Sequence, residues 1–162
     1  MKYVIRRLEA ADVSQVYALC IALFDESAQK NQGIDRSKGL RHLYDHVDNP
    51  YDLREIFVAV DRESDRIIGF LKCFISEYWY SNDRRAVHEF LYVTPEHRAT
   101  KVAVLLVESF VEWAKERDAI TCMLNAFIPS EQARDTFIGL ASRCGFEHAG
   151  VYFKKDIGDV RR

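Results

Sequence analysis

A basic segment between an apolar strand and an amphipathic helix is the part of this sequence best suited to bind a ligand. Phe90 to Val93 form a continuous apolar run, typical of a buried strand, and Pro95 ends it. From Thr100 onward the apolar residues recur every three or four positions, which predicts a helix. Arg98 and Lys101 lie where the first helical N–H groups have no intrahelical partner. Exposed donors, the positive end of the helix dipole and two cations together predict a site for an anion, most naturally a phosphate.

The same residues resemble a known family. Val93-Thr94-Pro95-Glu96-His97-Arg98 gives the pattern V-x-P-E-x-R, and a helix containing Leu105-Leu106 follows. This resembles the acetyl-CoA-binding motif of the GNAT N-acetyltransferases, whose loop usually reads R/Q-x-x-G-x-G/A. Here Arg98 to Ala103 read R-A-T-K-V-A, so Lys101 replaces the middle glycine. A lysine there would either add a phosphate contact or crowd the backbone approach that glycine permits.

The resemblance implies acetyl-CoA as the cofactor and assigns residues to it. In that family the strand before the loop separates from its neighbour, and its main chain pairs with the pantetheine arm. A serine stands where the family often has the asparagine of N-x-x-A, and Gly145-Phe146 follow the same helix, as in the family. The implied cofactor-binding residues are Leu91, Tyr92, Val93, Arg98, Ala99, Thr100, Lys101, Val102, Ala103 and Ser130.

Acetyl transfer to an amine needs a group that accepts the amine proton. Glu89 is the candidate general base, because it lies nine residues before Arg98, where many family members carry a glutamate that works through water. The alternatives are a solvent-facing carboxylate, a pair with Arg84 or Arg85, and His88 as the base, although strand alternation points His88 to the opposite face.

The general acid is where this chain departs from the family. The usual tyrosine lies four residues before the helix-ending glycine, a position that Ala141 occupies here, and counting forward from Ala133 gives Phe137 instead. Neither side chain has a proton to give. Tyr152, on the last expected strand, is the candidate to replace the tyrosine.

Carboxylates and aromatic residues predict the acceptor site. In this family the first helix, the following loop and the end of the long hairpin usually wall that site. Glu26, Glu77, Tyr78 and Tyr80 are therefore the candidate substrate-binding residues, suited to a cationic amine. The alternative is that they are ordinary solvated side chains.

The order of apolar patterns predicts a single α/β (α+β) domain, and the resemblance implies the same arrangement from end to end. We expect a mixed, mostly antiparallel sheet of about seven strands flanked by about four helices, spanning residues 1–157, with 158–162 as a tail. The expected strands are 3–8, 56–60, 66–80, a strand after a turn at 81–83 that ends at Val93, 119–127, 146–149 and 151–157. The expected helices begin near Asp12, Arg36, Thr100 and Ser130.

The composition of the chain excludes several classes of function. The chain has 162 residues, is 48% hydrophobic and has a net charge of −2, so it reads as an ordinary globular domain with no global basic field for nucleic acid. No apolar stretch is long enough to cross a bilayer. The four cysteines are scattered, which predicts reduced, buried thiols, with a cysteine nucleophile unsupported by any further signal. His42 and His46 lie at helical spacing, but without a third ligand we expect a solvated helix face and no metal site.

Together these observations predict a cytoplasmic N-acetyltransferase that moves an acetyl group from acetyl-CoA to a primary amine of a small molecule or a protein and that can assemble as a homodimer. The alternative is a non-catalytic protein of the same fold that binds CoA or a protein partner. Lys101 and the missing tyrosine favour that alternative.

Overall fold

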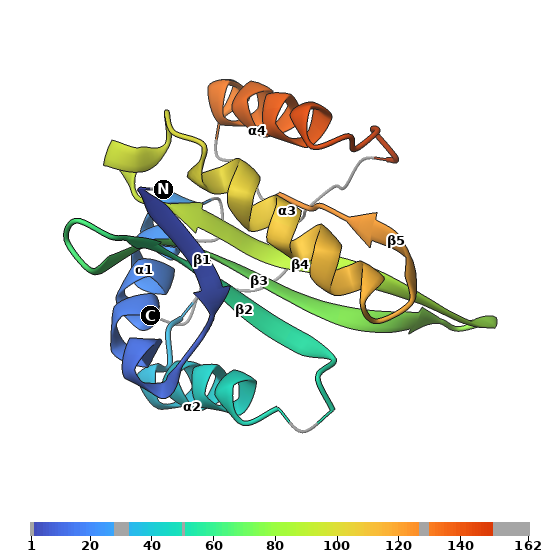
Figure 1. Ribbon diagram of the computed structural model, residues 1–162, viewed down its shortest axis with the longest axis horizontal. Helices are drawn as coiled ribbons and strands as arrows, with labels where there is room; N and C mark the ends of the chain where they lie inside the picture. Colours follow the sequence, from blue (N-terminus) through green and yellow to red (C-terminus); the bar gives the residue numbers. More distant parts are fainter. Residues whose placement is uncertain (1, 28–32, 50, 127–129, 151–162) are drawn as a thin grey trace.

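The protein is described by a computed structural model covering residues 2–27, 33–49, 51–126 and 130–150, and Figure 1 shows its elements. The five strands in these ranges are β1 (Tyr3–Arg7), β2 (Arg54–Asp61), β3 (Arg66–Tyr78), β4 (Ser81–Val93) and β5 (Ala119–Met123). The four α-helices are α1 (Val13–Glu26), α2 (Arg36–Val47), α3 (Val102–Lys115) and α4 (Glu131–Arg143). Two short 3₁₀ helices, η1 (Ala10–Asp12) and η2 (Pro95–His97), lead into α1 and the segment before α3.

The strands form one sheet in the order β1-β2-β3-β4-β5. Neighbours up to β4 are antiparallel, whereas β4 and β5 run parallel. The parallel pair needs a crossover, and α3 supplies it by passing over one face of the sheet (Figure 1). The predicted mixed, mostly antiparallel sheet and the four helices are confirmed.

The predicted number of strands, one turn and one strand end were wrong. The described residues contain five strands rather than about seven, because 146–149 follow α4 without joining the sheet and 151–157 lie outside the described residues. The expected turn at 81–83 is instead the start of β4, since Tyr78 pairs with Ser81 and leaves Trp79 and Tyr80 as the turn. The fifth strand ends at Met123 instead of 127. The expected end of the domain at 157 also lies outside the described residues.

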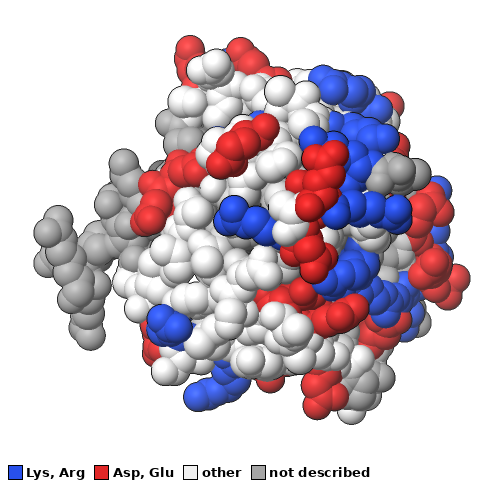
Figure 2. Space-filling view, turned by 60° about the vertical axis from the view of Figure 1, so that its left-hand side comes forward, with Lys and Arg blue, Asp and Glu red and all other residues white. Residues whose placement is uncertain are grey.

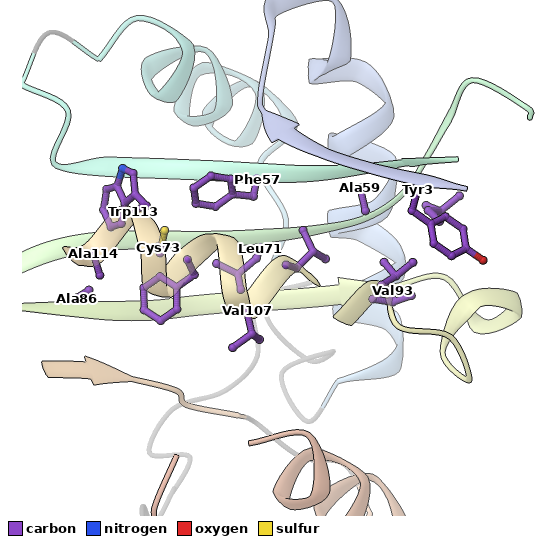
Figure 3. Close-up of a cluster of buried hydrophobic side chains, with 14 residues drawn as sticks. Tyr3, Phe57, Ala59, Leu71, Cys73, Ala86, Val93, Val107, Trp113 and Ala114 are labelled. Atoms are coloured by element: carbon purple, nitrogen blue, oxygen red, sulfur yellow. The ribbon is translucent and has the colours of Figure 1, made fainter. Parts of the chain in front are cut away.

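Apolar side chains pack on both faces of the sheet. On one face α3 buries Val102, Leu106, Val107, Phe110 and Trp113 against Phe57, Leu71 and Cys73 of β2 and β3 (Figure 3). On the other face α1 and α2 cover Ile56, Val58, Phe70 and Tyr92. Both faces of β2 and β3 are therefore covered, which explains why their sequences are nearly continuous apolar runs. No helix in the described ranges combines the length and apolarity needed to span a membrane.

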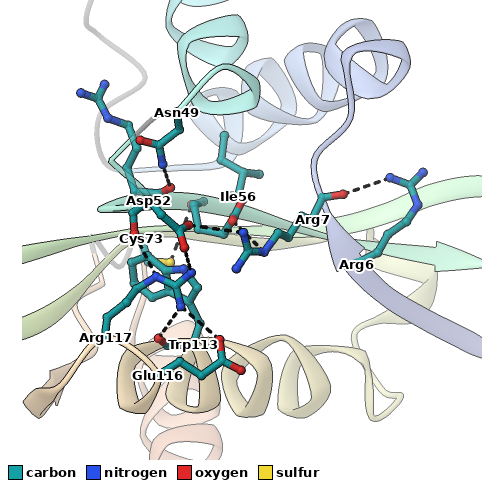
Figure 4. Close-up of polar contacts among 11 residues, drawn as sticks. Arg6, Arg7, Asn49, Asp52, Ile56, Cys73, Trp113, Glu116 and Arg117 are labelled. Atoms are coloured by element: carbon teal, nitrogen blue, oxygen red, sulfur yellow. Dashed lines mark hydrogen bonds and ion pairs between the residues drawn. The ribbon is translucent and has the colours of Figure 1, made fainter.

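A polar cluster fastens the end of α3 to the segment before β2 (Figure 4). The Arg117 guanidinium pairs with the Asp52 carboxylate, donates to the Asp52 carbonyl at 2.9 Å and to the Trp113 carbonyl at 3.0 Å, and lies 4.7 Å from the Trp113 ring. Only 10% of the Arg117 side chain is exposed. Because several donors of one buried cation are satisfied at once, this contact fixes where α3 ends relative to the sheet.

We expect Arg117→Ala to lower the free energy of unfolding by about 2 kcal/mol, since it removes charge-assisted hydrogen bonds from a nearly buried group. Urea unfolding at neutral pH measures this change. Lys115→Ala on the same helix is the matched control, because its pair with Glu112 is exposed and such pairs contribute little to stability. Equal effects of the two substitutions would contradict a fastening role for Arg117.

Candidate active site

Strands β4 and β5 separate partway along their length. Their pairing runs from Arg84 with Ala119 to Val87 with Met123 and stops there, although β4 continues to Val93. At the point of separation, the Asn125 backbone N–H donates to Nδ1 of His88 at 3.3 Å, and the Asn125 side-chain amide donates to the His88 carbonyl at 3.3 Å. Beyond it, the edge of β4 that faces away from β3 has no strand partner in the described residues. A main-chain edge is therefore open to a ligand.

A β-bulge lies in β4 at the same level. Lys72 of β3 pairs with Phe90 and the next residue, Cys73, pairs with His88, so Glu89 is an extra residue in β4. The bulge interrupts the alternation, because both Glu89 and Phe90 then face α1 and α2. His88 faces the opposite side, where its ring lies 6.5 Å from that of Phe137 on α4. His88 and Glu89 thus face opposite sides, as strand alternation predicted, and the effect of the bulge is that Phe90 shares the face of Glu89.

Glu89 is paired with a lysine of the neighbouring strand. The Lys72 ammonium donates to a Glu89 carboxylate oxygen and lies 5.7 Å from the centre of the Phe90 ring. The Lys72 side chain is 8% exposed and that of Glu89 is 39% exposed. Of the expected alternatives to a base, a pair with Arg84 or Arg85 is wrong, because Lys72 is the partner, whereas a solvent-facing carboxylate agrees with this partial exposure.

Glu89 lines a cleft where β4 leaves β5. The cleft has a volume of about 110 Å³ and lies between the end of α1, β4, the segment after β5 and α4. Its lining residues are Leu23, Phe24, Ser27, His88, Glu89, Phe90, Leu91, Asn125, Ala126 and Phe137. The structure thus brings the predicted base, Glu89, and the predicted cofactor strand residue Leu91 to one cleft.

His88 is buried and uncharged. Burial lowers the pKa of His88 to about 4, so its imidazole is neutral at pH 7. Its Nδ1 accepts from Asn125, which leaves the proton on Nε2, and no acceptor contacts Nε2 among the described residues. A neutral, fully buried imidazole is a poor competitor to Glu89 as the base.

Arg98, the expected phosphate ligand, makes internal contacts. Its Nε donates to the Val93 carbonyl at 2.9 Å and its Nη2 donates to the Glu26 carboxylate at 2.5 Å. The Tyr92 hydroxyl donates to the other Glu26 oxygen at 2.9 Å. Burial, followed by the effect of Glu26, raises the pKa of Tyr92 to about 12, so this phenol remains a donor at neutral pH. Glu26 therefore ties the end of α1 to the loop before α3, instead of facing an acceptor amine.

The start of α3 has backbone donors that the helix itself does not satisfy. The Thr100 hydroxyl accepts from the Val102 N–H at 3.3 Å, and the first backbone hydrogen bond of the helix joins the Leu105 N–H to the Lys101 carbonyl at 3.0 Å. No described atom accepts from the N–H of Ala103. Lys101 has φ −77° and an exposed side chain, so this backbone does not require glycine. Ala99 is exposed beside it, and Val102 is fully buried in the core.

The remaining predicted acceptor residues lie away from the cleft. Glu77 pairs in register with Arg84, five residues from Glu89, or roughly 16 Å along the strand. The rings of Tyr78 and Tyr80 lie at the tip of the β3–β4 hairpin with their centres 5.6 Å apart, and Tyr80 is largely exposed. These three residues do not line the cleft with Glu89.

Ser130 and Tyr152 complete the set of predicted residues. Ser130 caps α4, because its hydroxyl accepts from the Ala133 N–H at 3.2 Å, and so it has a structural role in the described chain. Tyr152 lies outside the described residues. Phe137, at one of the two places considered for the missing tyrosine, lines the cleft, whereas Ala141 does not.

Sequence reasoning missed Lys72, Asn125 and the aromatic wall formed by Phe24 and Phe90. A signal for Lys72 was present, since it is the single charged residue in the apolar run Ile67 to Ile75. A lone lysine in a strand covered on both faces requires a partner. No comparable pattern in the sequence marks Asn125.

The structure gives little support to a cysteine nucleophile or to a metal site at His42 and His46. All four cysteines are free, and burial raises the pKa of the Cys20 thiol to about 11, so it is protonated at neutral pH. The expected solvated face at His42 and His46 is wrong for His46, which is 5% exposed and contacts the His42 carbonyl through Nδ1 at 2.7 Å. No cluster in the described ranges has three groups able to hold a metal ion.

Acidic and basic side chains are interspersed on the face shown in Figure 2, with Lys and Arg more frequent at its right-hand side.

Solved structures share this architecture. Glucosamine-6-phosphate N-acetyltransferase from Arabidopsis thaliana has a TM-score of 0.72 and 16% identity, over 98% of this chain and 100% of that chain. The aminoglycoside acetyltransferase meta-AAC0020 from an uncultured soil metagenomic sample, solved with sisomicin, has a TM-score of 0.72 and 20% identity, over 97% of each chain. AAC(6′)-Iy with a CoA-containing bisubstrate analogue has a TM-score of 0.74 and 16% identity, over 97% of this chain and 100% of that chain. At these identities the likeness establishes the fold.

Comparison at the level of sequence identifies the family. No curated protein sequence matches this chain. The model of the Acetyltransferase (GNAT) family, however, matches residues 17–146, a span that runs from α1 past the end of α4 and includes the cleft and the loop before α3. The chain belongs to the acetyltransferase (GNAT) family.

Proposed function

We propose that this protein is an N-acetyltransferase that moves the acetyl group of acetyl-CoA to a primary amine, with Glu89 as the general base. The observation that supports this most is the position of Glu89 in a cleft where β4 loses its strand partner. A thioester carried along the open edge of β4 would end beside this carboxylate. Proximity and a positioned proton acceptor are the main requirements of the reaction.

The residues present fit acetyl-CoA. The unpartnered edge of β4 offers main-chain groups of Leu91, Tyr92 and Val93 to the pantetheine arm. The N–H groups at the start of α3 that the helix itself does not satisfy, with Arg98 and Lys101 beside them, suit the pyrophosphate. Ala103 and Ser130 stay in the proposed set, with Ala99, Thr100 and Val102 contributing through the backbone.

In the proposed reaction the amine nitrogen attacks the carbonyl carbon of the thioester, so that a C–N bond forms and the C–S bond breaks. Glu89 accepts the proton lost by the amine, directly or through a water, and the sulfur leaves as a thiol after taking up a proton. Tyr152 remains the proposed donor of that proton. Coenzyme A is a tolerable leaving group, so the reaction does not depend strictly on this donor.

A small-molecule amine is the proposed acceptor. Similar folds occur in proteins named for glucosamine 6-phosphate and for aminoglycosides, which are small amines. A protein amine is the alternative acceptor. A homodimeric assembly and a cytoplasmic location are parts of the same proposal, and the four free cysteines are consistent with a reducing compartment. Glu77, Tyr78 and Tyr80 at the hairpin tip would then contact only an acceptor large enough to reach them.

The second candidate is a non-catalytic CoA-binding protein. Lys101 in place of glycine and Phe137 in place of tyrosine favour it. The two candidates differ in one measurement. An enzyme releases free thiol from acetyl-CoA when a suitable amine is added, whereas the binding protein shows calorimetric affinity for acetyl-CoA and releases no thiol with any amine.

The contact of Arg98 with Glu26 generates a paired prediction for CoA binding. Arg98→Gln should weaken CoA binding about tenfold, because it removes a charge-assisted contact to phosphate. Glu26→Gln should strengthen binding, because the carboxylate that now shares the Arg98 guanidinium is neutralised. Isothermal calorimetry with CoA measures both, and Arg41→Gln on the exposed face of α2 serves as the control. If both substitutions weaken binding, Glu26 is a structural support rather than a competitor.

Lys101 is expected to strengthen CoA binding. Its backbone is unstrained and its side chain is exposed, so it does not crowd the loop. Lys101→Gly should therefore weaken CoA binding by up to about 1 kcal/mol and reduce the dependence of affinity on salt. Calorimetry at low and high ionic strength gives both quantities. Tighter binding by the glycine variant would mean that the lysine obstructs the site.

Glu89→Gln should lower turnover roughly 10²-fold while CoA affinity barely changes, since general-base catalysis typically contributes that much. The deficit should shrink as pH rises, because a larger fraction of the acceptor amine is then already neutral. Thiol release across a pH series measures this, with Glu112→Gln on the exposed side of α3 as the matched control. Wild-type turnover of Glu89→Gln at neutral pH would remove Glu89 from the mechanism.

A further inference from the structure

The wall of the cleft is largely apolar. Leu23, Phe24 and Phe90 form the side towards α1, and the Phe24 and Phe90 rings meet edge to face with their centres 6.0 Å apart. Leu91 and Phe137 line the opposite side. Such a wall gains free energy by covering an apolar ligand body, and it offers few partners to a ligand rich in hydroxyl and ammonium groups.

The cleft also carries little net charge. Among the residues that line it in the described chain, Glu89 is the only acidic or basic one other than the neutral His88. The Lys72 ammonium, which is almost entirely buried, pairs with the Glu89 carboxylate, so the two charges offset each other. The nearby titratable groups facing Lys72 are Cys20 on α1 and His42 and His46 on α2, and none of these is a carboxylate.

The other carboxylates expected at the acceptor site are used elsewhere. Glu26 binds Arg98 and the Tyr92 hydroxyl. Glu77 lies at the hairpin tip, 4.0 Å from the Arg84 guanidinium. A site for a polycation needs surplus negative charge within a few ångströms, because Coulomb attraction is screened over about 10 Å in water. The described cleft lacks that surplus.

We propose that the acceptor is a primary monoamine on an apolar body, such as an alkylamine or an arylalkylamine, and that Lys72 is the residue that sets this charge preference. The proposal rests on the proposed acetyl transfer and names its acceptor class. The apolar body packs against the wall formed by Phe24 and Phe90, and the single amine reaches Glu89. Lys72 disfavours a second cation by neutralising the carboxylate that would attract it.

The first test compares acceptors with the wild-type protein. Thiol release from acetyl-CoA is measured with hexylamine, phenethylamine, 1,6-diaminohexane, glucosamine and kanamycin. We expect kcat/KM for the two monoamines to exceed that for the diamine, glucosamine and kanamycin at least tenfold. A higher kcat/KM for kanamycin or glucosamine would overturn the proposed acceptor class while leaving acetyl transfer intact.

Binding measurements test the acceptor class separately from acetyl transfer. Calorimetric titration of the same amines into the protein saturated with CoA needs no turnover. Preferential binding of phenethylamine without thiol release with any amine would support the acceptor class and contradict acetyl transfer. Tighter binding of kanamycin than of phenethylamine would contradict the acceptor class whatever the turnover.

Variants then test the two named contacts. Lys72→Met should raise the ratio of kcat/KM for 1,6-diaminohexane over hexylamine about tenfold, because the Glu89 charge is no longer cancelled, and added salt should reduce the gain. Lys72→Arg keeps the charge and should keep the wild-type ratio, and Lys115→Met, on an exposed lysine of α3, is the matched control. An unchanged ratio in Lys72→Met, with a circular dichroism spectrum like that of wild type, would overturn the role of Lys72.

Phe24→Ala addresses the apolar wall. It should lower kcat/KM for phenethylamine about tenfold through a higher KM, with CoA affinity unchanged. Tyr44→Ala, on the exposed side of α2, removes an aromatic ring of similar size away from the cleft and is the control. Equal effects of the two substitutions on phenethylamine would contradict packing of the acceptor against Phe24.

Discussion

The site depends on β4 having one partner along its whole length and a second partner along only part of it. Pairing with β3 continues from Ser81 to Val93, whereas pairing with β5 stops at Val87. Unpaired backbone groups inside a folded domain cost free energy unless water or a ligand satisfies them. An open strand edge beside a cleft is therefore a place where a ligand with amide groups gains more than it would at a closed sheet. The bulge at Glu89 lies at the same level, and Glu89 lines the cleft beside that edge.

The separation is held by packing on both sides of the sheet. Helix α3 buries its apolar face against β2, β3 and β4, and Arg117 fixes its far end to the segment before β2. Asn125 stops the pairing of β4 with β5, because its side chain occupies the His88 carbonyl that a strand residue would otherwise use. Phe137 of α4 then lies against His88. In the described chain the gap between β4 and β5 is thus bounded by specific contacts.

Local patterns predicted the fold better than the site. The period-three and period-four spacing from Val102 to Ala114 and the apolar runs of β2 and β3 depend on burial alone, which is why α3 and both strands were found. Glu89 was identified through its spacing to Arg98. The bulge was invisible, because it depends on the register between two strands and leaves no local mark in the sequence. The contacts of Glu26 could not be predicted for a related reason: its partners, Arg98 and Tyr92, are 72 and 66 residues away along the chain.

The unequal burial of Lys72 and Glu89 distinguishes a structural role of the pair from a catalytic one. Lys72 is almost entirely covered, whereas more than a third of Glu89 is exposed in the cleft. Loss of the carboxylate would strand a buried ammonium, which costs stability, whereas loss of the ammonium leaves a carboxylate that water can reach. Replacement of Glu89 by alanine would therefore confound the two roles, because an inactive variant could simply be destabilised. Glutamine keeps an oxygen that accepts a hydrogen bond from the Lys72 ammonium, while it removes the negative charge and the capacity to accept a proton. The glutamine variant is consequently the one in which a loss of turnover reports on chemistry.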